Sequence, residues 1–241
     1  MNPYLVEFLG TMLMIFIICV GSGVVVFSQK AEVRRKEKMI LVLAGSFSLL
    51  IVCWLFGNST TYFNSAVTLT LLLDSTLPFR TAVFYICAQA AGAFSGAVAV
   101  YICFFKKFNT SWDPGAKLCV FCSGFGCDRI RYDSFFLPFI KETVTTFLYV
   151  FGIRLLGATA LPGGLQIILV VMANLLLGFL LDAHNLRAMD PIRDMMPRLV
   201  HAILPIRGKG SSVWDAGRCT WAGSTVGAVV AVCLYHLIFK A

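Results

Sequence analysis

The sequence predicts an all-α membrane protein of six transmembrane helices plus two half-helices, arranged as an inverted repeat of three spans and three spans. The first observation is composition: 59% of the residues are hydrophobic and 13% are charged. A soluble domain would carry about 25% charged residues. The second is a set of apolar runs of about 20 residues, the length that crosses a bilayer. The third is an internal duplication.

Six apolar runs are long enough to span a membrane. The first, at 4–27, lacks a basic start and is too long for a signal-peptide core, so we expect a helix there. The others lie at 39–57, 81–105, 135–157, 165–181 and 219–239. We therefore expect a multi-pass protein of the cell membrane with the lipid bilayer as a partner. The net charge of +8 is spread over loops, which favours headgroups and water over nucleic acid.

Two apolar segments are too short to span, and each follows the second long run of its half. They are "NSAVTLTLLL" at 64–73 and the segment 190–204, which starts at Asp190. At roughly ten to fifteen residues, each is expected to enter the membrane and end inside it as a half-helix.

The internal duplication relates the starts of the two halves. "PYLVEFLGTMLMIF" aligns with "PFIKETVTTFLYVF" and matches Glu7 with Glu142 at an offset of 135. Because each half has an odd number of spans, the halves must lie in opposite orientations. Folds of this kind place their sites at the midplane, where discontinuous helices meet.

The ends of the two halves also align, "AGAFSGAVAVYICFF" with "WAGSTVGAVVAVCLY". Shifted by one position so that the glycines coincide, the two stretches place Gly92 and Gly96 opposite Gly223 and Gly227, and each pair has the spacing that lets helix backbones approach closely. We expect a single transmembrane domain over residues 1–241, with halves of about 1–107 and 134–241 and a linking loop at 108–133.

That linking loop contains the cysteine cluster "LCVFCSGFGC", with Cys119, Cys122 and Cys127. A zinc site needs four ligands and no histidine lies near, so we favour a small-residue loop; a metal site or a disulfide remains the alternative. Most of the other cysteines lie in apolar runs, where cysteine acts as a small hydrophobe.

With these features, the chain resembles the aquaporin or major intrinsic protein family, specifically its bacterial glycerol-facilitator branch. "NSAVTLTLLL" is similar to the first Asn-Pro-Ala half-helix of that family, and "MDPIRDMMPRL" is similar to the second. "DPGAKLCVFCSG" and "HAILPIRGKGSSVW" resemble its loops. The resemblance implies a passive, homotetrameric channel for glycerol, other polyols and water, without a cofactor.

The two half-helix tips are the candidate pore centre. A helix N-terminus carries unsatisfied N–H groups and about half a positive charge, so two tips that meet repel cations. In the family an Asn caps each tip and points its amide at the solute. The matching residues here are Asn64, Ser65, Ala66, Asp190, Pro191 and Ile192. The alternative for Asn64 is a plain N-cap in a loop.

Asp190 departs from the family's asparagine. A carboxylate only accepts hydrogen bonds, whereas an amide also donates them. An ionised Asp190 would weaken the positive barrier and favour cations, but neutralisation by burial or by an arginine would let the barrier persist. Ser65 replaces a proline that pre-sets the helical φ, and Ile192 adds bulk where the family has alanine.

The resemblance also implies a constriction, at Ala44, Gly178, Arg187 and Arg193, with Asp194 following. Arg193 matches the family's arginine, which holds solute hydroxyls and excludes cations; the alternative is a loop arginine paired with Asp194. The family's two aromatic positions fall at Ala44 and Arg187. Two arginines at one narrow pore would repel each other. We therefore expect Arg187 to pair with Asp190, and Arg193 with Asp194 or a loop carbonyl.

Glu7 and Glu142 are intramembrane acids, which by default suggest function. The resemblance implies that they brace the loops before the half-helices by accepting backbone N–H groups, and proton relay is the alternative. No nucleophile or metal constellation is present in the sequence, so we expect neither an enzyme nor catalytic residues. Because of Asp190 and Arg187, two other functions stay open: a channel with altered ionic selectivity, and a non-conducting scaffold.

The expected membrane orientation conflicts with the charge distribution. The family has cytoplasmic termini, which would place the basic residues of 30–38 outside, against the positive-inside rule. We follow the family, because the inverted repeat is tied to its topology.

Overall fold

The computed structural model describes residues 1–28, 30–56, 62–122, 135–181 and 188–239. Within these ranges the chain forms eleven helices and no strand. In chain order they are α1 (Pro3–Val26), α2 (Ala31–Arg35), α3 (Glu37–Phe56), α4 (Ser65–Leu73), α5 (Phe79–Cys103), α6 (Phe105–Thr110), α7 (Pro114–Phe121), α8 (Phe136–Gly157), α9 (Gly163–Leu181), α10 (Pro191–Ile203) and α11 (Trp214–Phe239).

Six helices of the described part are long and apolar enough to cross a membrane, namely α1, α3, α5, α8, α9 and α11. These are the six predicted spans. They begin and end within five residues of the predicted runs, the largest difference being the start of α11 at Trp214. Since run length alone sets whether a helix can span, composition was sufficient to place them.

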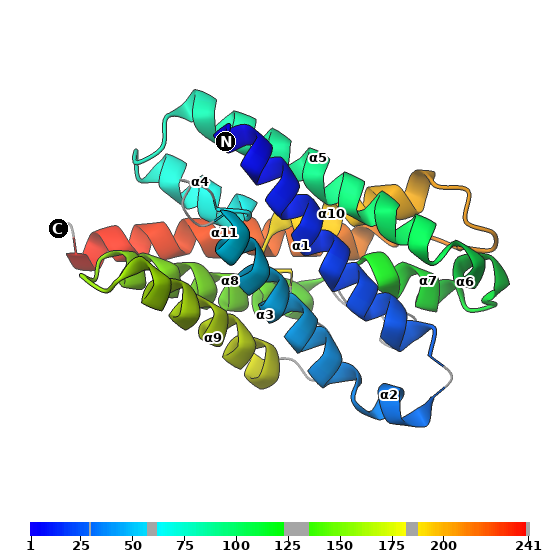
Figure 1. The fold of residues 1–241 in the computed structure, drawn as a ribbon. Coiled ribbons are helices and arrows are strands. Elements are labelled where there is room, and N and C mark those ends of the chain that lie inside the picture. The colour runs from blue at the N-terminus through cyan, green and yellow to red at the C-terminus, as the bar shows by residue number, and fades with distance from the viewer. Residues whose placement is uncertain (29, 57–61, 123–134, 182–187, 240–241) are drawn as a thin grey trace.

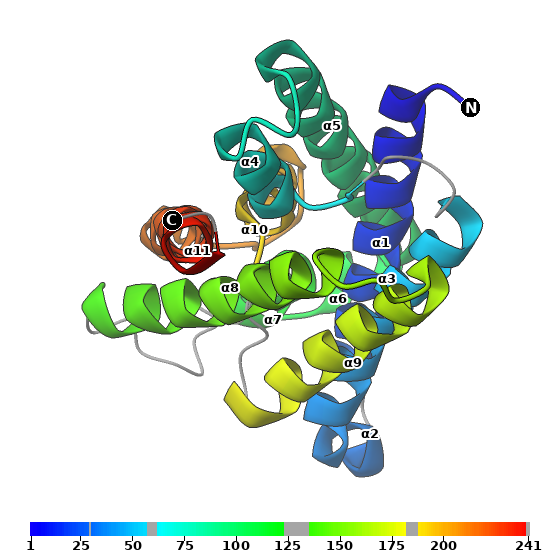
Figure 2. The same cartoon turned by 90° about the vertical axis from the view of Figure 1, so that its left-hand side faces the viewer.

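The two short helices, α4 and α10, extend in opposite directions from the middle of the molecule (Figure 1). They are 9 and 13 residues long, too short to span. α4 extends toward the end where both termini lie, and α10 extends toward the end that carries α6 and α7 (Figure 1). Both lie between the α1–α5 pair and the α8–α11 pair, and they touch each other (Figure 2). The two halves are therefore inverted.

Close backbone contact holds each of these helix pairs together. A Cβ on Gly92 would lie 2.3 Å from the Phe8 carbonyl oxygen, and one on Gly227 would lie 2.5 Å from that of Thr143. Because Phe8 and Thr143 match at the offset of 135, the contacts pair Gly92 with Gly227. The predicted match of Gly92 with Gly223 is wrong by one helical turn, since small residues recur every four positions and allow either register.

The described part of the predicted loop at 108–133 contains a helix, α7, over Pro114–Phe121. Pro114 starts this helix, and the Asp113 side chain caps it by accepting from the Ala116 N–H at 3.0 Å. Cys119 on α7 is disulfide-bonded, so the small-residue loop that we favoured is wrong for this residue. Cys122 is a buried thiol, and Cys127 lies outside the described residues. In the described ranges, no cluster of acids, histidines and cysteines could hold a metal ion.

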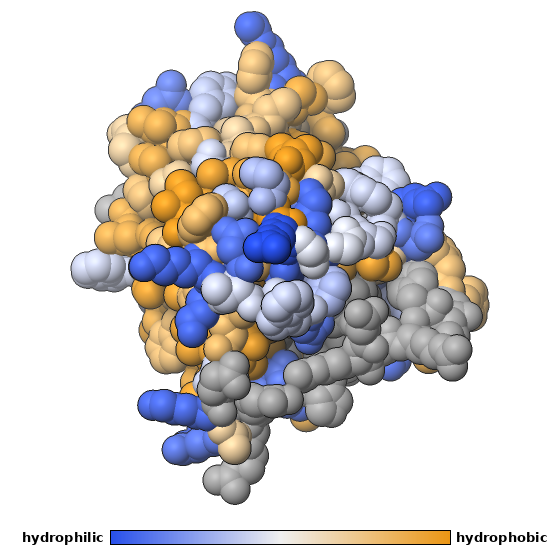
Figure 3. Space-filling model, turned by 90° about the vertical axis from the view of Figure 1, so that its right-hand side faces the viewer, coloured by the Kyte–Doolittle hydropathy of each residue, from blue (hydrophilic) through white to orange (hydrophobic). Residues whose placement is uncertain are grey.

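Apolar side chains cover much of the outside. Trp54, Leu180 and Leu237 are 81%, 70% and 71% exposed, which suits contact with lipid or a neighbouring subunit. At the end of the molecule that carries α6 and α7, hydrophilic side chains gather near the centre, with apolar ones above and to the left (Figure 3). Polar side chains at this end suit contact with water and lipid headgroups, whereas the apolar flanks suit the hydrocarbon core.

Candidate functional site

A cavity lies at the half-helix tips, bounded by α1, α3, α8 and α9. The centre of a water molecule can reach about 70 Å³ of it, whereas one water needs roughly 10–15 Å³ by this measure. The cavity is therefore large enough for several waters in single file or for one small polyol. Ile18, Leu49 and Leu177 give it an apolar wall, and the tips contribute Asn64, Asp190 and Arg193.

Asn64 caps α4 and also reaches across to the other half. Its Oδ1 accepts from the N–H groups of Ala66 at 2.8 Å and Val67 at 3.2 Å. Its Nδ2 donates to the Met189 carbonyl at 3.0 Å. The amide therefore ties the start of α4 to the residue just before the start of α10.

Asp190 caps α10 and reaches across in the opposite direction. Its Oδ1 accepts from the Ile192 N–H at 3.1 Å, from the Ser65 N–H at 3.2 Å and from the Ser65 hydroxyl. Its Oδ2 is buried and has no hydrogen-bond partner among the described residues. Arg187, the partner that we expected, lies outside those residues.

The residues before both caps have left-handed backbone. Phe63 has φ 51° and Met189 has φ 50°, a conformation that is rare and strained for side chains of this size. Neighbouring side chains therefore have to hold it in place, because the backbone alone would not adopt it.

Two buried acids stabilise the left-handed backbone before the caps. Glu7 accepts from the N–H groups of Tyr62 at 2.6 Å and Phe63 at 2.9 Å, and Glu142 accepts from the Met189 N–H at 2.8 Å. Gln89 donates to Glu7 at 3.0 Å, which fixes the first acid further. Both acids are fully buried. They position the segments from which the two tips start.

Of the four expected constriction residues, Gly178 and Arg193 line the cavity, and Arg187 lies outside the described residues. The expectation for Ala44 is wrong. Its Cβ points toward α1, 2.7 Å from where a Cβ on Gly21 would lie. The face of α3 toward the cavity instead carries Val42, Gly45, Ser46 and Leu49, which are spaced like one helical face.

Several lining residues have no counterpart in the sequence-based prediction. Phe63 and Tyr149 bring aromatic rings to the cavity, and Ser46 and Asn174 bring polar groups from α3 and α9. The helical spacing from Val42 would have pointed to Ser46. No comparable signal marks Tyr149, because the face of α8 that meets the cavity depends on packing.

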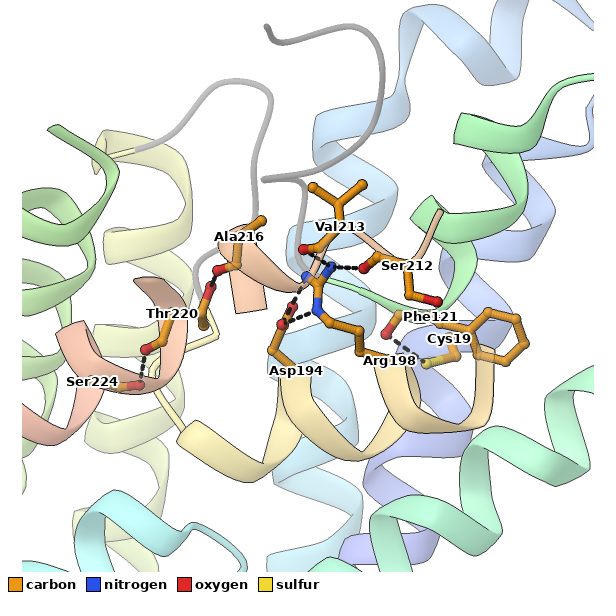
Figure 4. A network of polar contacts seen from close by, with 9 residues as sticks. All are labelled: Cys19, Phe121, Asp194, Arg198, Ser212, Val213, Ala216, Thr220 and Ser224. Carbon is orange, nitrogen blue, oxygen red and sulfur yellow. Dashed lines mark hydrogen bonds and ion pairs between the residues drawn. The ribbon is translucent and has the colours of Figure 1, made fainter. Parts of the chain in front are cut away.

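Behind the second tip lies a buried ion pair. Asp194 accepts from Arg198 Nε at 2.9 Å and pairs with its Nη2 at 2.8 Å, and both side chains are fully buried. Arg198 Nη1 donates to the carbonyls of Ser212 at 2.6 Å and Val213 at 3.0 Å (Figure 4). The pair therefore joins α10 to the chain entering α11. The spacing of four residues could have revealed it.

A family model described as Major intrinsic protein matches residues 1–235. The chain is 33% identical over 242 residues to the probable glycerol uptake facilitator protein of Thermotoga maritima, covering 99% of this chain and 100% of that protein. It is 30% identical over 244 residues to the glycerol uptake facilitator protein of Bacillus subtilis, covering 100% and 86%. The aquaglyceroporin structure from Plasmodium falciparum matches with a TM-score of 0.78 at 20% identity, covering 99% of this chain and 96% of that one, and shares its fold.

Proposed function

Because the chain belongs to the major intrinsic protein family, we propose that it is a passive channel for glycerol and similar small uncharged solutes, together with water, in the cell membrane. Two relatives that the chain covers to 100% and 86% of their length are named probable glycerol uptake facilitator protein and glycerol uptake facilitator protein. The observation that carries the proposal is the cavity at the two half-helix tips, which is lined by Asn64, Asp190 and Arg193.

The cavity suits a polyol because it offers both apolar contacts and hydrogen-bonding groups. The apolar wall of Ile18, Leu49 and Leu177 can take the C–H edge of the solute, while the tips take its hydroxyls. Arg193 carries fixed donors and a permanent charge, so it can hold a hydroxyl and repel cations. No covalent step and no cofactor are part of the proposal.

Cation conduction and a non-conducting scaffold, the two alternatives raised by Asp190 and Arg187, are less well supported. The Asp190 carboxylate is held by Ser65 and by the start of α10. Arg193 lies in the same cavity, where a fixed positive charge opposes the entry of cations.

We also propose a homotetramer, in which the exposed apolar faces of the spans are shared between neighbouring subunits and lipid. Among the large apolar side chains of the described spans, Trp54 on α3 is the most exposed, at 81%. The number of subunits is measured by the mass of the purified protein in detergent, after subtraction of the detergent contribution. A monomer at working concentrations would refute this part.

The proposed channel function is tested by stopped-flow light scattering on proteoliposomes, with glycerol, water and a trapped proton-sensitive dye. We expect glycerol and water flux well above the lipid baseline without a proton leak. Substitution of Arg193 by alanine should raise proton or cation leak, because the charge that faces the pathway is removed. Glycerol flux at the lipid baseline, from protein shown to be folded, would overturn the proposal.

A further inference from the structure

Ser65 and Asp190, one from each half-helix tip, are joined by two hydrogen bonds to a single carboxylate oxygen. Resting on the proposed function, we propose that this pair turns the pore centre into a hydrogen-bond acceptor site. Such a site selects solutes that donate O–H or N–H groups over solutes that only accept.

Serine at the first position of α4 brings two donors into the membrane interior. Ser65 is 5% exposed, and buried donors need an acceptor. A proline at this position, as in the Asn-Pro-Ala motif, has neither an N–H nor an O–H group. The Oδ1 atom of Asp190 accepts from both donors of Ser65. Ser65 and Asp190, the two residues that differ from the motif, therefore supply each other's hydrogen-bond partners.

The Ser65 contact leaves the other carboxylate oxygen without a hydrogen bond to the described residues. Asp190 lines the cavity at 2% exposure, and its Oδ2 has no partner within the described part of the chain. An asparagine would place donor hydrogens at this position, whereas a carboxylate oxygen only accepts. The swap therefore reverses the hydrogen-bonding direction at mid-pore.

A second buried oxygen extends the same site. The Ser46 hydroxyl, on α3, belongs to a residue that lines the cavity at 3% exposure, and it too has no partner among the described residues. A hydroxyl can accept as well as donate. The Ser46 hydroxyl therefore adds a second acceptor to the proposed site.

The site does not need a cation to balance its charge. Oδ1 accepts N–H groups from the starts of both α4 and α10. Each helix start carries about half a positive charge, so together they offset about one negative charge. Arg193 adds a positive charge in the same cavity. The arrangement favours uncharged donors such as polyol hydroxyls and the N–H groups of urea.

Asp190→Asn is the direct test, because it exchanges the unpartnered carboxylate oxygen for an NH₂ group while the amide oxygen can keep the bonds to Ser65. Flux of glycerol and of dimethyl sulfoxide, which accepts but does not donate, is measured in the same proteoliposomes. We expect the ratio of glycerol to dimethyl sulfoxide flux to fall about tenfold, the effect of one hydrogen bond. Ser48→Ala serves as control, because Ser48 is buried on α3 and its hydroxyl donates to the Gly45 carbonyl at 2.7 Å.

An unchanged flux ratio in Asp190→Asn, with both fluxes still dependent on the protein, would overturn the inference and leave the proposed channel intact. If wild-type protein carries no glycerol at all, the proposed function fails instead. If Asp190→Asn does not fold, the ratio is measured in the double variant Ser65→Pro, Asp190→Asn, where the same fall is expected.

Coupling between the two residues gives a second readout. Ser65→Pro alone removes both donors from Asp190 and should lower glycerol flux or folded yield about tenfold or more, because hydrogen bonds to charged groups are lost. The double variant should recover most of that loss, since an asparagine needs fewer donors than a carboxylate. Additive losses would show that the residues act separately and would overturn the inference.

Discussion

Removal of Arg198 is expected to destabilise the protein strongly. The substitution Arg198→Met keeps much of the side-chain volume but removes the guanidinium. Asp194 then loses its two contacts at 2.9 and 2.8 Å, and the carbonyls of Ser212 and Val213 lose their donor. The Asp194 side chain is fully buried and Ser212 is 8% exposed, so water replaces the lost bonds poorly there.

The size of the effect follows from burial. Both partners are 0% exposed, and removal of one partner from a buried pair costs about 3–5 kcal/mol. At about 2–4 °C per kcal/mol for a chain of this size, the unfolding temperature in detergent should fall by roughly 6–20 °C. The double variant Asp194→Asn, Arg198→Met should fall less, because no carboxylate is left without its guanidinium.

Arg218→Met is the matched control, because Arg218 forms an ion pair with Asp215 whose side chains are 71% and 69% exposed. Surface pairs contribute about 0–1 kcal/mol, so its shift should stay below about 4 °C. Thermal unfolding followed by tryptophan fluorescence gives all midpoints. Equal shifts for Arg198→Met and Arg218→Met would refute the argument that burial gives this pair its strength.

Two further variants test the packing and the braces. Gly92→Ala should lower the unfolding temperature, because its Cβ would lie 2.3 Å from a backbone oxygen, whereas Gly152→Ala, with nothing within 4 Å, should not. Overpacking of this kind costs about 1–3 kcal/mol, and equal midpoints would contradict the close-approach reading. Glu7→Leu should cost about 1–3 kcal/mol for each backbone N–H left unpaired, at Tyr62 and Phe63. An unfolding midpoint within 1 °C of wild type would show that the hydrogen bonds of Glu7 to Tyr62 and Phe63 do not stabilise the protein.

Helices were easier to predict than the faces they turn to the cavity. The segment 64–73 becomes Ser65–Leu73 and the segment from Asp190 becomes Pro191–Ile203, because run length and N-cap chemistry are local properties. The position of Ala44 is different. Each helical residue turns the side chain by about 100°, so a shift of one residue moves it to another face. Placement by residue count alone was therefore insufficient.

The partners of Asp190 illustrate a second limit. A charge search in the sequence finds Arg187 three residues away, but the structure satisfies the Oδ1 atom with N–H and O–H groups, two of them 125 positions away on Ser65. The partial positive charge at a helix N-terminus comes from the backbone, so it is not visible in the amino-acid sequence. The disulfide at Cys119 is a further case, because cysteine spacing alone left a loop, a metal site and a disulfide open.

The acids behind the tips explain why the tips can differ in side chain and still meet. Phe63 and Met189 have nearly the same left-handed φ, 51° and 50°, although one precedes an asparagine and the other an aspartate. What the two positions share is a buried glutamate that accepts the backbone N–H, Glu7 for Phe63 and Glu142 for Met189. The backbone is therefore fixed from behind, and the pore-facing cap side chains are left to set which hydrogen bonds a solute meets. Exchange of the cap residue should then alter selectivity before it alters the fold, whereas loss of either glutamate should alter both.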